Sequence, residues 1–172
     1  MVEIAPITAA DIESFHRTLD SVARERRYLS FVQAPPLDST RAFVLDMIAH
    51  GYPQLVALSG GEVVGWCDVT PKSGPIDARI GVLGMGLLPQ FRHQGIGSHL
   101  MARALADARA FGFSRVELTV YRSNVNAIRL YEKAGFVIKA VQPAEAPGDA
   151  IDKTVLIMAL SLHAPEAGWR LP

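Results

Sequence analysis

Residues 87–100 of the sequence read LLPQFRHQGIGSHL. An apolar run ends at a proline, a short basic loop follows, and Gly95 and Gly97 then open a stretch of helix-forming residues. The first backbone N–H groups of a helix lack internal partners and carry partial positive charge. Glycines there let a ligand approach the main chain, and Arg92 and His93 add positive charge. The stretch therefore predicts a pocket for a phosphate or pyrophosphate at the start of a helix.

Two other phosphate-binding motifs do not fit this sequence. A P-loop needs G-x-x-x-x-G-K-[ST], and neither Lys72 nor Lys153 follows the required glycine. A dinucleotide fingerprint needs G-x-G-x-x-G, whereas residues 84–86 (GMG) continue to Pro89. A nucleotide-binding enzyme of the Rossmann type is therefore disfavoured. The remaining alternative is that the glycines serve only close packing between helix and strand.

Turn and capping signals divide the rest of the chain into short elements. Thr8 and Asp11 resemble a capping box, Asp38 and Asn124 can cap further helices, and residues 59–61 (SGG) predict a hairpin turn. The predicted strands cover residues 2–7, 54–58, 63–69, 80–88, 116–120, 136–141 and 154–160. The predicted helices cover residues 12–23, 39–49, 95–110 and 124–134. The order β-α-α-β-β-β-α-β-α-β-β predicts an α/β fold with a mixed sheet of about seven strands.

The composition indicates one globular domain. The chain has 172 residues, of which 49% are hydrophobic and 20% charged, and its 17 basic and 17 acidic residues give a net charge of zero. Such hydrophobicity excludes intrinsic disorder, and this length suits one domain. The neutral balance argues against a nucleic-acid partner, because binding to phosphates demands a cationic face.

Cysteine usage and the apolar segments indicate a cytoplasmic protein. A single cysteine, Cys67, excludes an internal disulfide and favours a reducing compartment. Its apolar surroundings favour a buried small side chain, and a nucleophilic cysteine is the alternative. The N-terminus lacks the apolar core of a signal peptide, and residues 80–88 are too few to span a bilayer. The histidines lack metal-ligand spacing, so we expect neither a membrane partner nor a metal.

A second motif lies downstream, where residues 124–136 read NVNAIRLYEKAGF. Together with residues 92–97 (RHQGIG), which match the pattern Q/R-x-x-G-x-G/A, it resembles the GCN5-related N-acetyltransferase (GNAT) superfamily. The resemblance covers residues 2–160. It implies a GNAT-type mixed sheet with helices on both faces, in a single acetyltransferase domain over residues 1–162 followed by a C-terminal tail over 163–172.

The resemblance also implies acetyl-CoA as co-substrate and assigns a role to individual positions. The strand end would pair with the pantetheine arm, as in β-augmentation, through Met85, Gly86 and Leu87. The pyrophosphate turn would consist of Arg92, His93, Gln94, Gly95, Ile96, Gly97 and Ser98. Asn124 would lie near the cofactor, either in addition to capping a helix or only as a cap. Tyr131 would lie beside the thioester sulfur and protonate the leaving thiolate as a general acid, or only pack on the sheet.

The reaction implied is a direct attack of a neutral amine on the acetyl carbonyl, with backbone N–H groups near Leu87 stabilising the oxyanion. The amine must first lose a proton. Some members of the superfamily place a glutamate at the position of Thr119, which cannot act as that base. Glu117, Asp68, Glu25 and a water relay remain open as the base.

We expect the acceptor to be the primary amine of a small molecule or amino acid. Its pocket would involve the irregular residues 24–37 with Tyr28 and Phe31, the loop near Asp77 and the last hairpin. Residues 148–158 resemble a GNAT subgroup that contains amino-acid and ribosomal-protein acetyltransferases. The alternatives are a protein N-terminus or lysine as acceptor, or a non-catalytic acyl-CoA-binding regulatory domain. A homodimer with Trp169 at its interface and the use of other acyl-CoAs both stay open.

Overall fold

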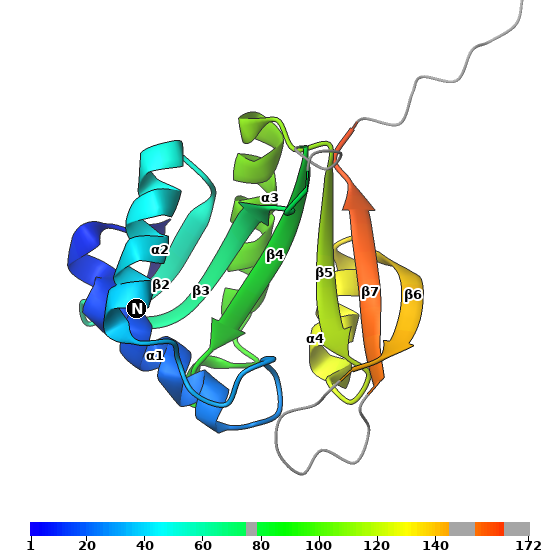
Figure 1. The fold of residues 1–172 in the computed structure, drawn as a ribbon. Coiled ribbons are helices and arrows are strands. Elements are labelled where there is room, and N and C mark those ends of the chain that lie inside the picture. The colour runs from blue at the N-terminus through cyan, green and yellow to red at the C-terminus, as the bar shows by residue number, and fades with distance from the viewer. Residues whose placement is uncertain (75–78, 145–153, 164–172) are drawn as a thin grey trace, which may run out of the picture.

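The computed structural model describes residues 1–74, 79–144 and 154–163, and the elements follow the predicted order (Figure 1). The strands are β1 Val2–Pro6, β2 Gln54–Ser59, β3 Glu62–Pro71, β4 Ile80–Leu87, β5 Arg115–Tyr121, β6 Val137–Pro143 and β7 Thr154–Ser161. The helices are α1 Ile12–Arg24, α2 Leu37–His50, α3 Ile96–Phe111 and α4 Val125–Lys133, with 3-10 turns at Ala9–Asp11 and Pro89–Phe91.

Local sequence signals account for several boundaries. Gly60 and Gly61 both have positive φ, which is the two-residue hairpin turn expected between β2 and β3. The backbone N–H of Thr8 donates to Asp11 Oδ2 at 2.8 Å, which fixes the turn before α1. The prediction that Asp38 caps α2 is wrong. Pro36 holds that position, because a proline that lacks an N–H is tolerated at a helix start, and Asp38 lies inside the first turn.

The seven strands form one mixed sheet in the order β1-β2-β3-β4-β5-β7-β6. All neighbouring strands are antiparallel except β4 and β5, which are parallel. That pair is joined by the crossover through α3, as a parallel connection requires. The mixed sheet predicted from the order of elements is confirmed.

Helices cover both faces of the sheet: α1 and α2 lie in front of it in Figure 1, and α3 and α4 lie behind. Each face has its own buried cluster, because side chains alternate along a strand. Cys67 belongs to the larger cluster beneath α3 and α4, and its neighbour Trp66 belongs to the cluster beneath α1 and α2. Burial raises the pKa of Cys67 well above its usual value, which argues against the nucleophile alternative.

Some expectations fall on residues outside the described ranges, namely the loop near Asp77, the segment 148–152 and Trp169. No helix of the described chain is long and apolar enough to cross a membrane. Within the same residues no group of three or more His, Cys, Asp or Glu side chains could hold a metal ion.

Candidate functional site

The parallel strands β4 and β5 separate after a short stretch of pairing. They are in register only from Ile80 to Val82, opposite Arg115 to Glu117, and their carboxyl ends diverge (Figure 1). The gap opens into a cavity of about 380 Å³. The residues that line it come from the α1 end, β4, the turn before α3, β5 and α4: Val22, Tyr28, Leu29, Leu83, Gly84, Met85, Gly86, Leu87, Arg92, His93, Gly95, Gly97, Ser98, Thr119, Val120, Asn124, Asn126, Ala127, Leu130 and Tyr131.

The diverging end of β4 offers backbone groups to this cavity. The N–H of Leu88 donates to the carbonyl of Val64 at 2.9 Å, and the N–H of Lys72 donates to that of Ile80 at 2.8 Å. In an antiparallel ladder the bonded positions alternate, so the even-numbered residues of β4 bond to β3. The backbone groups of Met85 and Leu87 therefore point toward the gap that β5 leaves, where the Leu87 carbonyl already accepts a hydrogen bond from Arg92 Nε.

The start of α3 forms the mouth of the cavity. His93 and Gly95 have φ of 60° and 80°, a left-handed turn that glycine adopts at no steric cost. Gly95 is the N-cap, and the first helical bond runs from the N–H of His99 to its carbonyl at 3.1 Å. The N–H groups of Ile96, Gly97 and Ser98 therefore have no partner within the helix. They form the positive end of the helix dipole, as an anion site requires.

The Arg92 guanidinium is paired with a carboxylate. Its Nε donates to the carbonyl of Leu87 at 2.9 Å, its two terminal nitrogens donate to the carboxylate of Glu25, and it stacks on the ring of Tyr28 at 4.9 Å from the centroid. Both charged side chains are only 22% exposed. Glu25 thus offsets the positive charge that Arg92 was expected to add to the anion pocket.

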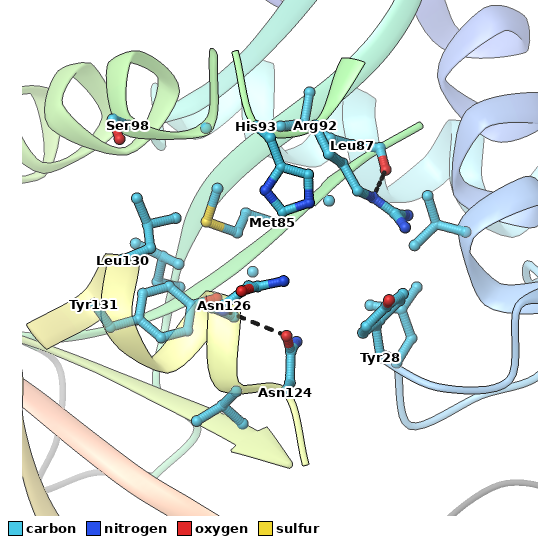
Figure 2. Close-up of a pocket in the computed structure, with 18 of the residues that line it drawn as sticks. Tyr28, Met85, Leu87, Arg92, His93, Ser98, Asn124, Asn126, Leu130 and Tyr131 are labelled. Atoms are coloured by element: carbon cyan, nitrogen blue, oxygen red, sulfur yellow. Dashed lines mark hydrogen bonds between the residues drawn. The ribbon is translucent and has the colours of Figure 1, made fainter. Parts of the chain in front are cut away.

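The second sequence motif forms the opposite wall of the cavity (Figure 2). The side-chain oxygen of Asn124 accepts the N–H of Ala127 at 3.3 Å, so this asparagine is the N-cap of α4 and also lines the cavity. The ring of Tyr131 packs edge-on against Phe136, with centroids 5.8 Å apart. Burial raises the pKa of the Tyr131 hydroxyl above its usual value, so it stays protonated at physiological pH and can donate a proton.

The family model of the acetyltransferase (GNAT) family matches residues 18–136, which is more than half of the chain and includes both motifs. The chain belongs to the GNAT acetyltransferase family.

Curated relatives of this GNAT chain include enzymes with different acceptors. The L-amino acid N-acetyltransferase AaaT of Escherichia coli (strain K12) is 31% identical over 90 residues, which are 52% of this chain and 56% of AaaT. A mycothiol acetyltransferase of Propionibacterium freudenreichii is 29% identical over 89 residues, or 51% of this chain and 28% of that protein. The chain thus matches about half of the first relative and less of the second.

Solved structures share the GNAT fold over nearly the whole chain. A GNAT acetyltransferase from Streptococcus pneumoniae superposes with a TM-score of 0.85 at 24% identity, covering 94% of this chain and 99% of that one. A phosphinothricin acetyltransferase from Sinorhizobium meliloti in complex with acetyl-CoA gives 0.86 at 19% identity, covering 98% and 96%. Both confirm the predicted fold.

The structure brings most of the predicted cofactor residues to one cavity, and two of them lie elsewhere. The Ile96 side chain is buried in the core beneath α3, and the Gln94 side chain donates to the carbonyl of Gln90 at 2.8 Å. If these two positions contact a ligand, they do so through the main chain. Of the predicted acceptor-side aromatics, Tyr28 lines the cavity and Phe31 does not.

Sequence reasoning missed several wall residues of the GNAT cavity. Asn126, Ala127 and Leu130 of α4 line the cavity together with Tyr131. Residues 127, 130 and 131 follow the three-to-four-residue spacing of a helix face, which was the signal available in the sequence. Val22 and Leu29 also line the cavity, and they gave no local signal.

The carboxylates considered as bases lie in different environments. Glu117 sits at the closed end of the sheet, where hydrogen bonds from Lys72 Nζ at 2.9 Å and from Arg115 hold its pKa below the usual value. Glu25 is paired with Arg92. Asp68 is buried on the α1–α2 face of β3, and burial raises its pKa from 3.8 to about 7. Cationic partners thus occupy the carboxylates of both Glu117 and Glu25.

Proposed function

We propose that this chain is an acetyl-CoA-dependent N-acetyltransferase that transfers acetyl to the primary amine of a small molecule or amino acid by direct attack. The observation that carries the proposal is the meeting of the two motifs at the cavity where β4 and β5 diverge. The start of α3, called the helix mouth below, lies at one end of this cavity, and its free N–H groups suit a phosphate. The part of β4 that does not pair with β5 lies along the cavity.

The residues of the cavity fit acetyl-CoA in shape and chemistry. A Cβ at Gly97 would lie 3.4 Å from Leu87 Cδ1 and 3.5 Å from Met85 Cε, so the helix mouth lies directly against the strand end. The N–H groups of Ile96, Gly97 and Ser98 would hold the pyrophosphate, and the backbone of Met85 and Leu87 would pair with the pantetheine arm. Acetyl-CoA supplies the activated acetyl thioester when bound.

Tyr131 would act as the proton donor to the departing sulfur. Its hydroxyl has no hydrogen-bond partner within the described residues, and it is kept protonated by burial. A phenol that lines the cavity without a protein acceptor is available to a bound ligand. The N–H of Leu87 faces the same space and would stabilise the negative charge that develops on the carbonyl oxygen.

Two observations favour a small molecule or amino acid as the acceptor: the side chains of the cavity wall next to α1, and one relative. Val22, Tyr28 and Leu29 give that side an apolar and aromatic lining, which suits a small organic molecule. The relative AaaT is named for L-amino acid acetylation. A protein N-terminus or lysine is the second candidate acceptor.

The decisive experiment measures free thiol after the protein is mixed with acetyl-CoA and a panel of amines, amino acids and peptides. Thiol release with small amines or amino acids supports the proposal, and release only with peptides favours a protein acceptor. Binding of acetyl-CoA by calorimetry without release for any amine would favour the regulatory-domain alternative.

A matched pair of variants tests the site itself. Gly97→Asp places a negative charge at the helix mouth and should weaken acetyl-CoA binding at least about tenfold. Gly97→Ala adds only a methyl group with contacts of 3.4 Å or more and should change affinity much less. Because an aspartate stabilises a helix N-terminus, lost binding would not reflect lost folding. Unchanged affinity in Gly97→Asp would count against this cofactor site.

A further inference from the structure

Asp68 is a buried carboxylate that nothing in the described protein neutralises. It is 8% exposed, and no hydrogen bond or ion pair reaches it from residues 1–74, 79–144 or 154–163. Buried polar groups in folded proteins are almost always paired, so an unpaired carboxylate needs an explanation. Ligand binding is one such explanation, because a bound ligand can supply the hydrogen-bond donor that the protein does not.

The strand register places Asp68 beside the cavity. Gly84 is its partner on β4, and a Cβ there would lie only 3.4 Å from Asp68 Oδ1. Gly84 itself lines the cavity. The three atoms nearest to that Cβ position all belong to the Asp68 carboxyl group, at 3.4, 3.8 and 3.9 Å, so Gly84 alone separates the carboxylate, which does not itself line the cavity, from the cavity wall. The cavity residues on this face, Tyr28 and Val22, belong to the side where we place the acceptor.

The partner of Asp68 on β2 and the buried residues of the helices that cover its face carry no charge that could pair with the carboxylate. Gln54 is its partner on β2, and both side-chain amide atoms of Gln54 are buried without a hydrogen bond. The buried residues of the two covering helices are all non-ionisable: Ile12, Phe15, Thr18, Val22 and Ala23 of α1, and Thr40, Val44 and Met47 of α2. The thiol of Cys67, which precedes Asp68 on β3, points to the opposite face.

We propose that Asp68 is the catalytic base of this protein, binding the ammonium group of the acceptor across Gly84 and removing its proton. This rests on the proposed acetyltransfer. It also supplies a base although Thr119 stands where some members of the superfamily carry a glutamate: the carboxylate comes from β3 instead of β5.

The proton and bond changes balance without another reactant. The Asp68 carboxylate accepts one proton from the acceptor ammonium and later gives it to water. The neutral amine nitrogen forms a bond to the acetyl carbonyl carbon, and the carbon–sulfur bond of the thioester breaks. The sulfur takes a proton from the Tyr131 hydroxyl, which regains one from the attacking nitrogen. The products are the amide, the free thiol and one proton in solution.

The environment of Asp68 suits this task. A base works best when its pKa lies near the working pH, and burial brings the pKa of Asp68 to about 7. Activity with a good amine should therefore fall as the pH drops below about 7, because Asp68 becomes protonated.

The test compares Asp68→Asn with wild type and with Glu117→Gln, which removes a carboxylate at the closed end of the sheet. With an amine from the panel at pH 8, we expect kcat/KM of Asp68→Asn to be at least about 100-fold lower than that of wild type. The fall in activity below pH 7 that we expect for wild type should be absent from this variant. Calorimetry should show acetyl-CoA affinity within about twofold of wild type. Glu117→Gln should retain both the activity of wild type and its fall below pH 7.

A second variant guards against a folding artefact. Gly84→Ala places a methyl group between Asp68 and the cavity with ordinary contacts of 3.4 Å or more, so it should fold. We expect at least a tenfold lower kcat/KM for the amine. Asp68→Asn with near wild-type kcat/KM and an unchanged fall in activity below pH 7 would overturn the assignment while leaving the proposed function intact. A wild type that binds acetyl-CoA and acetylates no amine would overturn both.

Discussion

Tyr131 occupies a position where packing and chemistry can be separated by removing one atom. Its ring contacts Phe136, whereas its hydroxyl has no partner within the described residues. Tyr131→Phe keeps the ring and should lower kcat about 10- to 100-fold while leaving the Kd for acetyl-CoA within about twofold. Stopped-flow thiol detection and calorimetry give the two values. Equal turnover in the two proteins would remove the role as acid and leave only the packing.

Asp68 should also leave a signature in stability, independent of catalysis. Below its usual pKa of 3.8 the carboxyl is neutral in folded and unfolded chains, so burial costs little. As the pH rises toward 7 only the unfolded chain ionises, so the free energy of unfolding falls. Above about 7 the penalty is complete, at most about 4 kcal/mol.

Asp68→Asn removes this titration. Relative to wild type, its free energy of unfolding should therefore rise between pH 4 and pH 8, which urea denaturation at the two pH values measures. The difference between the two proteins isolates Asp68 from Asp20 and Glu117, whose pKa values are lowered and which act in the opposite direction. A difference that does not change with pH would mean that the carboxyl is solvated.

At the scale of elements, the Arg92–Glu25 pair joins the segment after α1 to the turn before α3. The two residues are 67 positions apart, and their contact places Tyr28 over the cavity. We expect Arg92→Ala and Glu25→Ala each to raise the KM for the amine several-fold. Acetyl-CoA affinity should change little, because the guanidinium faces Glu25 and not the helix mouth.

A double-mutant cycle checks that the pair acts as a unit. The stability loss of the double variant should be smaller than the sum of the single losses by about 1–2 kcal/mol, as expected for a half-buried bidentate pair. If Arg92→Ala weakened acetyl-CoA binding tenfold and Glu25→Ala did not, Arg92 would be a phosphate ligand after all.

These elements also show what the sequence could predict. The hairpin at Gly60, the helix mouth at Gly95 and the cap at Asn124 depend on a few neighbouring residues, and all three were predicted. The Arg92–Glu25 pair and the contact between Asp68 and Gly84 depend on register and on distant segments. Neither leaves a local pattern, so nothing in the sequence indicated that Glu25 pairs with Arg92, and Asp68 was one of several open bases.

At the scale of the whole molecule, the sheet of the described residues consists of two parts, which meet at three pairs of residues on β4 and β5. One part holds β1 to β4, and the other holds β5, β7 and β6. The core beneath α3 and α4 unites them, since it contains Leu55 and Val69 from the first part and Val116 and Met158 from the second. The molecule can thus keep an open gap at one end of the sheet without dividing into two domains.

Amide hydrogen exchange tests this arrangement across the molecule. Without ligand, the N–H groups of Met85 and Leu87 should exchange at least about tenfold faster than those of Gly84 and Gly86, which bond to β3. Saturation with acetyl-CoA should slow Met85 and Leu87 selectively, because the pantetheine arm then supplies the acceptors that β5 does not.

Val56 on β2 provides the control for that measurement. It lies between β1 and β3, so ligand binding should change its exchange only through the general gain in stability that any ligand of the folded state gives. If Met85 and Leu87 slowed by no more than Val56, the ligand would not lie along β4. The gap between the two parts of the sheet would then need another explanation, because a row of open backbone groups inside a folded protein is costly unless something binds there.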